Sequence, residues 1–128
     1  MNHLKVKKIV INIFKNFKLK EAHAKISAEY LIKAELLGAP SHGLARLKMY
    51  CERLNKKIIN PNPKIKIKKI SQSISHIDAN NSIGFVGADL GIKTAIKNAK
   101  KTGIGLVAVK NSGHYGLSSF YAEQAVKK

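Results

Sequence analysis

Cysteine, tryptophan and long apolar runs are scarce or absent in this 128-residue chain. The one cysteine, Cys51, cannot form a disulfide framework, and no metal-binding spacing surrounds it. No apolar run approaches the ~20 residues that a membrane-spanning helix needs. The first residues, Met1 to Val6, are polar and contain no apolar signal core. These absences predict a reduced, cytoplasmic protein without a membrane segment, and the length suits one ordinary domain.

Acidic residues and arginine are scarce as well. Seven Asp and Glu stand against 24 Lys and Arg, so the formal net charge is +17. That charge invites a nucleic-acid partner, and a small basic nucleic-acid-binding protein is one alternative function. However, only Arg46 and Arg53 are arginine, and the planar arginine fork is the group best suited to base readout. Because the lysines are scattered along the chain, specific nucleic-acid binding is not expected.

Apolar periodicity predicts an α/β (α+β) fold with a helical front and an α/β back. The expected helices cover residues 4–17, 20–37, 41–55 and 85–99, with a last one starting near 117 or 118. The expected strands cover 64–70, 73–78 and 104–109, with a loop over 78–84. We expect Ile65, Ile67 and Ile70 to face inward or toward a partner, and the run from Ile104 to Val109 to be buried on both faces. The Pro-rich connector at 60–63 divides a region 1–60 from a region 61–128.

The stretch from Pro40 to Tyr50 carries the first group of chemically useful residues. If the residues after Ser41 form one helix, then His42, Arg46, Tyr50 and Arg53 share one face. Arginine binds carboxylates with two parallel hydrogen bonds, and histidine transfers protons near neutral pH. Ser41 either caps the helix or hydrogen-bonds the imidazole. The group suits an anionic substrate with an exchangeable proton, and the alternative is an exposed helix face with a capping serine.

A second stretch, N-S-G-H-Y-G at 111–116, lies between an expected strand and an expected helix. Such a junction offers backbone N–H groups to an anion, and His114 is a second candidate acid or base. The alternative is an ordinary glycine turn. The loop matches neither the dinucleotide fingerprint nor the P-loop. We expect His3, His23 and His76 to be structural or surface residues with satisfied hydrogen bonds, and no metal site.

Four motifs in order resemble the malate/L-lactate dehydrogenase family of NAD(P)-dependent oxidoreductases. They are G-A-P-S-H-G-L-A-R-L-K-M-Y, I-N-P-N-P-K-I, D-A-N-N-S-I-G and T-G-I-G-L-V-A-V-K-N-S-G-H-Y-G-L-S-S-F-Y-A-E. The resemblance runs over essentially the whole chain. It implies a helical N-terminal region (1–60), followed by part of a mixed-sheet, non-Rossmann nicotinamide-binding domain (61–128).

The resemblance also implies roles for individual residues. Ser41 would be the partner in a proton relay, His42 the acid or base, and His114 a second catalytic histidine. Arg46 would bind the substrate carboxylate, with Tyr50 nearby. The cofactor, NAD or NADP, would be bordered by His114, Tyr115, Gly116, Leu117 and Ser118. The reaction would transfer hydride between nicotinamide and a small 2-hydroxy or 2-keto acid, in an enzyme that forms homodimers when complete.

Two features depart from the family pattern. Pro40 stands where the family usually has an acidic residue, and family members are considerably longer. The chain therefore resembles the N-terminal part of such an enzyme, inactive alone unless a second polypeptide completes it. A noncatalytic remnant, with an exposed sheet edge, is the remaining alternative.

Overall fold

The computed structural model describes residues 2–127 and forms two compact units that divide between Asn62 and Pro63. The division lies two residues beyond the expected boundary at 60/61. The first unit is helical, and the second combines helices with a three-stranded mixed sheet. The predicted α/β (α+β) fold class is confirmed.

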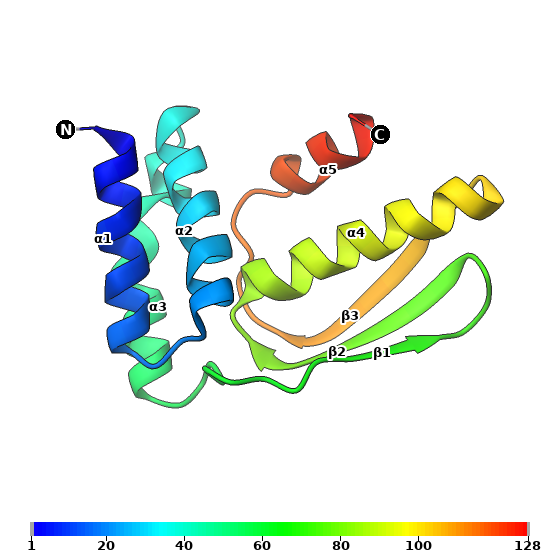
Figure 1. Ribbon diagram of the computed structural model, residues 1–128, viewed down its shortest axis with the longest axis horizontal. Helices are drawn as coiled ribbons and strands as arrows, with labels where there is room; N and C mark the ends of the chain where they lie inside the picture. The colour runs from blue at the N-terminus through cyan, green and yellow to red at the C-terminus, as the bar shows by residue number, and fades with distance from the viewer. Residues whose placement is uncertain (1, 128) are drawn as a thin grey trace. The chain divides into compact units, whose positions relative to one another are not determined.

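The first unit is built from three α-helices lying side by side (Figure 1). They are α1 (His3–Asn16), α2 (Glu21–Leu36) and α3 (Leu47–Asn55), with two 3-10 turns, η1 (Pro40–His42) and η2 (Leu44–Arg46), before α3. The Asn2 side chain caps α1 by accepting a hydrogen bond from the Leu4 N–H at 2.8 Å. Val10 and Phe14, one turn apart, are the buried positions of α1. The first two helices therefore follow the predicted periodicity to within one residue at each end.

The third helix was predicted to begin at Ser41, and this is wrong. The chain makes two short turns between Pro40 and Arg46, and the α-helix begins at Leu47. Gly43 separates the turns with φ −97° and ψ −136°, which is outside the helical region. Residues before and after Gly43 therefore do not follow one helical phase.

The second unit packs one long helix against a small sheet. It contains β1 (Lys66–Lys69), β2 (Ile74–Ser82), α4 (Gly84–Thr102), β3 (Leu106–Ser112) and α5 (Ser119–Val126). The sheet order is β1-β2-β3, with β1 antiparallel and β3 parallel to β2. Figure 1 shows α4 running across one face of this sheet. The buried Ile77, Ile83 and Phe85 supply apolar side chains at the β2–α4 junction, and Gly103 ends α4 in the left-handed region at φ 81°.

The predicted loop over 78–84 is wrong, because β2 continues to Ser82. An irregularity in the pairing lies between Asp78 and Ser82, where Asn80 and Asn81 take positive φ. Asp78 accepts hydrogen bonds from the Asn111 side chain at 2.9 Å and the Asn80 N–H at 3.0 Å, which lower the pKa of its carboxyl. Asn and Asp normally indicate a turn, and here they form a bulge within the strand pairing.

The prediction that 104–109 is buried on both faces is also wrong. Ile104 is 66% exposed and Leu106 is 59% exposed. The physical reason is that β3 is an edge strand, paired only with β2 in the part of the chain that the structure describes. At the other edge, Ile67 and Ile70 are exposed too, so they do not face inward.

His23 on α2 was expected to have its hydrogen bonds satisfied, and it does not. Its Nδ1 atom is buried and has no hydrogen-bond partner within residues 2–127. Burial lowers the pKa of His23 below its usual 6.5, and the nearby Lys20 lowers it further. The folded protein therefore keeps this imidazole neutral more strongly than the unfolded chain does.

We expect the free energy of unfolding to fall as the pH drops below about 6.5, because the unfolded chain then binds a proton that folded His23 resists. Urea denaturation between about pH 7.5 and 5.5 measures this slope. The variant His23→Leu should flatten it, whereas His76→Leu, at an exposed strand position, should leave it in place. An unchanged slope in His23→Leu would assign the pH dependence to other groups.

Candidate active site

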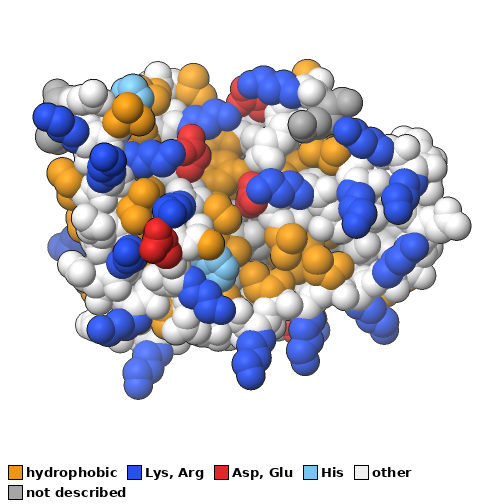
Figure 2. Space-filling model, viewed as in Figure 1, with side chains coloured by type: hydrophobic (Ala, Val, Ile, Leu, Met, Phe, Trp, Pro, Cys, Tyr) orange, Lys and Arg blue, Asp and Glu red, His pale blue; other side chains and the backbone are white. Residues whose placement is uncertain are grey.

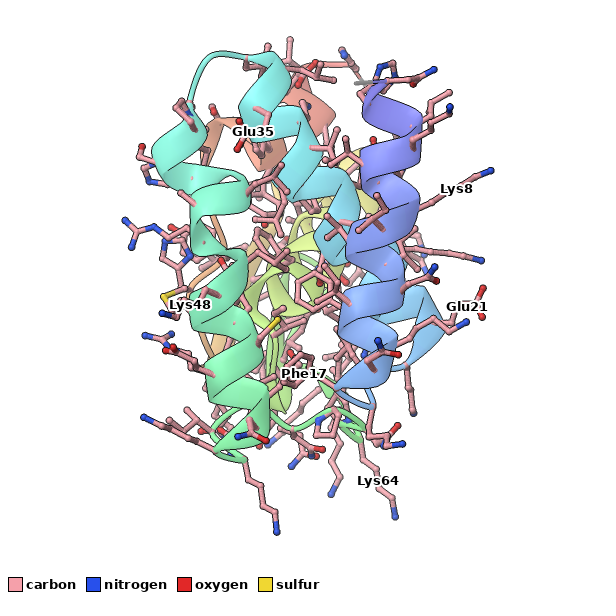
Figure 3. All side chains as sticks on the ribbon, turned by 90° about the vertical axis from the view of Figure 1, so that its left-hand side faces the viewer. Lys8, Phe17, Glu21, Glu35, Lys48 and Lys64 are labelled. Atoms are coloured by element: carbon pink, nitrogen blue, oxygen red, sulfur yellow. The ribbon has the colours of Figure 1, made fainter. Side chains whose placement is uncertain are left out.

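The turn that carries Ser41, His42 and Arg46 is held against the end of α2 by Glu35. The Glu35 Oε1 atom accepts a hydrogen bond of 2.6 Å from the Leu44 N–H, at the start of η2. Figure 3 labels Glu35 beside this connection. A methyl group at Gly43 would overlap the same carboxylate. A side chain at 43 would therefore have to displace the Glu35 carboxylate, a contact that was not predicted from the sequence.

Hydrogen bonds within the turn bring Ser41, His42 and Arg46 together. The Ser41 Oγ lies 3.1 Å from His42 Nδ1, and the Arg46 Nε–H donates to the Ser41 carbonyl at 2.7 Å. Ser41 thus bonds the imidazole, one of the two alternatives left open, and does not cap a helix. Ser41 and Arg46 are exposed and His42 is half-buried. No acidic side chain forms an ion pair with Arg46 anywhere in the described residues.

Tyr50 does not share this exposed surface, so the predicted face of four residues is wrong. Its side chain is only 1% exposed, and its ring meets that of Phe14 edge-on with centroids 6.5 Å apart. Burial raises the pKa of the Tyr50 hydroxyl, against the smaller lowering effect of Arg53 and Arg46. The break at Gly43 is the reason, because Tyr50 follows the phase of α3 and not that of the turn before it.

The second predicted stretch lies at the carboxyl end of β3, where parallel α/β sheets commonly bind ligands. The backbone carbonyls of Gly113 and His114 lie so close to Gly84, the first residue of α4, that a methyl group there would overlap both. Gly116 takes φ +79°, and a methyl group on it would lie 2.8 Å from Phe85 Cε1. The glycines at 84 and 116 therefore fix the loop against the start of α4.

Tyr115 and Tyr121 continue this loop into α5. The Tyr121 hydroxyl donates a hydrogen bond of 2.6 Å to the Tyr115 carbonyl, and the two rings meet edge-on at 5.7 Å. An open groove of about 380 Å³ lies beside them, between α4, β3 and α5. Small and apolar residues line most of it, together with Tyr115, Ser118 and Tyr121. The structure thus places part of the predicted cofactor border on one groove.

Of the predicted site residues, Ser41, His42 and Arg46 come together in the first unit, and 114–118 form one loop in the second. Sequence reasoning missed Glu35, Gly43 and Gly84, which position these loops. Glycines next to the histidine motifs were the available signal, since a glycine beside a reactive residue often permits a close approach.

The similarity to known proteins extends over both the turn that carries Ser41, His42 and Arg46 and the 114–118 loop. The sequence pattern that describes malate/L-lactate dehydrogenases matches residues 1–128. The chain belongs to the malate/L-lactate dehydrogenase family. The L-sulfolactate dehydrogenase of Methanocaldococcus jannaschii is 38% identical, over 95% of this chain and 36% of its own length. The ureidoglycolate dehydrogenase (NAD(+)) of Escherichia coli K12 is 34% identical, over 85% of this chain and 31% of its own.

A solved structure gives the same result for the fold. The malate dehydrogenase of Pyrococcus horikoshii OT3 superposes with a TM-score of 0.95 at 35% identity, covering 99% of this chain and 36% of that one. The chain therefore spans about a third of the length of the family members it matches. Within residues 2–127, no three His, Cys, Asp or Glu side chains are grouped as a metal site. No helix in the same residues combines the length and apolar character needed to cross a membrane.

In this member of the malate/L-lactate dehydrogenase family, Gly43→Ala should lower the free energy of unfolding by ~1.5–3 kcal/mol. The methyl group displaces the Glu35 carboxylate, so the charged hydrogen bond to Leu44 is lost. Gly113→Ala is the matched control, because nothing lies within 4 Å of the added methyl group, and it should cost less than ~0.5 kcal/mol. Equal costs in urea denaturation would contradict the role given to Glu35.

Proposed function

We propose that this chain supplies the carboxylate-binding and proton-transferring part of an NAD(P)-dependent 2-hydroxy acid dehydrogenase. The observation that carries the proposal is the turn in which Ser41 contacts His42 and Arg46 is tied to the Ser41 backbone. Histidine beside an unpaired arginine suits a substrate that carries both a carboxylate and an exchangeable hydroxyl proton.

Each residue of the turn has a proposed task. The guanidinium of Arg46 binds the substrate carboxylate, and its Nε–H bond to the Ser41 carbonyl fixes the direction of the fork. His42 gives a proton to the carbonyl oxygen of a 2-keto acid and takes it back from the hydroxyl in the reverse reaction. Ser41 holds the His42 ring through Nδ1, so the proton moves at the other ring nitrogen, Nε2. His114 is proposed as a second catalytic histidine.

The residues present fit one border of a nicotinamide cofactor. The 114–118 loop leaves β3 beside an open groove, and Gly116 and Gly84 allow close backbone approach there. We propose that Tyr115, Leu117 and Ser118, with Gly116 and His114, border the cofactor. When bound, NAD or NADP exchanges hydride with carbon 2 of the substrate.

The chain alone is proposed to be catalytically incomplete. It spans about a third of its relatives' length, and its edge strand β3 exposes apolar side chains beside the groove. We propose that the rest of the family polypeptide packs over the exposed side chains of β3 and over the groove beside them. We also propose a homodimer for the complete enzyme and a cytoplasmic location, the latter because its single cysteine, Cys51, leaves no disulfide framework.

No observation favours the nucleic-acid alternative to the same degree. Figure 2 shows Lys and Arg side chains spread over the whole face in view, without one dominant patch. The exposed arginine of the turn, Arg46, is set beside a histidine, which phosphate-backbone binding does not require.

The test is a chimera in which residues 1–128 of this chain replace the matching third of the M. jannaschii L-sulfolactate dehydrogenase. We expect the folded chimera to oxidise NADH or NADPH with a 2-keto acid, and the 128-residue chain alone to show no turnover. The remaining two thirds without this chain is the control. A folded chimera that binds the cofactor but has no turnover on any 2-keto acid would overturn the proposal.

A further inference from the structure

The second half of α4 presents polar residues to the cleft beside β1 and β2, whereas a helix packed on a sheet normally presents apolar residues. Thr94, Lys97, Asn98 and Lys101 follow the spacing i, i+3, i+4, i+7, so they form one stripe along the helix. The neighbouring stripe toward β3 is small and apolar, with Ala88, Gly91, Ile92 and Ala95. Asn98 is buried in this stripe, whereas Lys97 and Lys101 are exposed at the edge of the cleft.

A cleft of about 470 Å³ lies between this stripe and the sheet. Its other lining residues are Ile67, Lys69, Gln72 and Ser75. Its floor is ordered and polar, because Asn98 and Ser75 are only 9% and 3% exposed. The Asn98 Nδ2 donates to the Ser75 Oγ at 3.1 Å and to the Ser73 carbonyl at 3.4 Å. This bonding fixes the side chains beneath the lysines.

The charge of the cleft is uncompensated. Lys69 comes from β1 and Lys97 and Lys101 from α4, and no acidic residue lines the cleft. Within residues 2–127 none of the three forms an ion pair, whereas Asp89 and Asp78 in the same unit pair with Lys93 and Lys110. The carboxyl end of α4 contributes about half a negative charge, which three full positive charges outweigh.

We propose that this cleft binds a small, multiply charged anion of the phosphate class, held by Lys69, Lys97 and Lys101. Lysine binds phosphate as a point charge, whereas carboxylate sites favour the arginine fork. The volume suits a small molecule, and the cleft has neither arginine nor aromatic side chains for reading or stacking bases. The inference concerns the second unit alone and does not depend on the proposed dehydrogenase function.

The experiment is a titration of the ¹⁵N-labelled chain with inorganic pyrophosphate at constant ionic strength, followed by NMR. We expect saturable shifts confined to the amides around 67–75 and 94–101. The double variant Lys97→Gln/Lys101→Gln should weaken binding at least about tenfold, because two charged contacts are lost. The control Lys5→Gln/Lys8→Gln makes the same charge change on exposed positions of α1 and should weaken binding less than about twofold.

Several outcomes would overturn the proposal. Equal weakening in both double variants, or shifts spread over all lysines, would mean that the net charge alone attracts the anion. Tighter binding of a short single-stranded DNA to the same amides would assign the surface to nucleic acid. If circular dichroism shows that the cleft variant is unfolded, the shifts of the unaltered chain are the test. Shifts confined to the amides around 67–75 and 94–101 support the proposal, and shifts elsewhere overturn it. A parallel titration with adenosine diphosphate distinguishes a nucleotide ligand from a free phosphate. We expect adenosine diphosphate to bind no more tightly than pyrophosphate, and clearly tighter binding would assign the cleft to a nucleotide.

Discussion

Replacing Arg46 by methionine should lower kcat/KM for a 2-keto acid by about a hundredfold to a thousandfold in the chimera. Removing a charged group that pairs with a carboxylate typically costs ~3–4 kcal/mol, which corresponds to that factor. Arg46 is exposed and has no acidic partner among the residues that the structure describes, so its charge remains available to a substrate. Steady-state kinetics with increasing keto acid measures the effect, chiefly as a raised KM.

Lys48→Met is the matched control for this variant. It removes one positive charge two residues away on α3, from an exposed side chain whose only ion pair among the described residues is with Glu52 of the same helix, at 3.9 Å. We expect a change in kcat/KM of less than about threefold, because long-range charge effects are screened by salt. Equal losses in the two variants would mean that Arg46 acts only through the general positive field.

Replacing His42 by asparagine should lower kcat by about a hundredfold to ten-thousandfold in the same chimera. General acid–base catalysis by a positioned side chain typically contributes that much. Asparagine keeps a polar group near the Ser41 hydroxyl but cannot transfer a proton, so KM should change little. The loss therefore falls on kcat, which separates it from the loss expected for Arg46.

His76→Asn, at an exposed position of β2, is the control and should retain full activity. His114→Asn belongs in the same series, because His114 is the second proposed catalytic histidine. If His42→Asn retains kcat while His114→Asn loses it, the proton transfer belongs to His114 and the assignment of His42 is wrong.

Helical periodicity was sufficient to predict α1, α2 and α4. Val10 and Phe14 recur with the period of the helix and are buried in the structure, as an amphipathic pattern requires. The expected helix over 85–99 extends by one residue at its start and three at its end, as α4 (Gly84–Thr102). These elements depend on local spacing, which is fully visible in the sequence.

The turn before α3 depends on a contact between residues far apart in the sequence. Glu35 reaches the Leu44 N–H across eight intervening residues, and its carboxylate occupies the space that a side chain at Gly43 would need. A single helix from Ser41 was the simplest continuation of the pattern, and this contact overrides it. The α-helix begins only at Leu47 and Tyr50 is buried in the core, although Ser41, His42 and Arg46 still come together.

The strand errors have a different cause. The apolar run that includes Ile104 and Leu106 is typical of a strand between two neighbours, but β3 has one neighbour in this structure. A sequence pattern reports the environment for which a strand is suited, not the neighbours that are present. The exposed edge is thus consistent with a chain that spans about a third of its relatives' length.

The most direct test of the account compares a 2-keto acid with its uncharged amide as substrates for the chimera. If Arg46 binds the substrate carboxylate, the ratio of kcat/KM for acid over amide should fall at least about tenfold in Arg46→Met. The amide should lose little from the same substitution, since it has no charge to pair. Equal losses for both substrates, with the ratio unchanged, would contradict the account and give Arg46 a purely structural role in the turn.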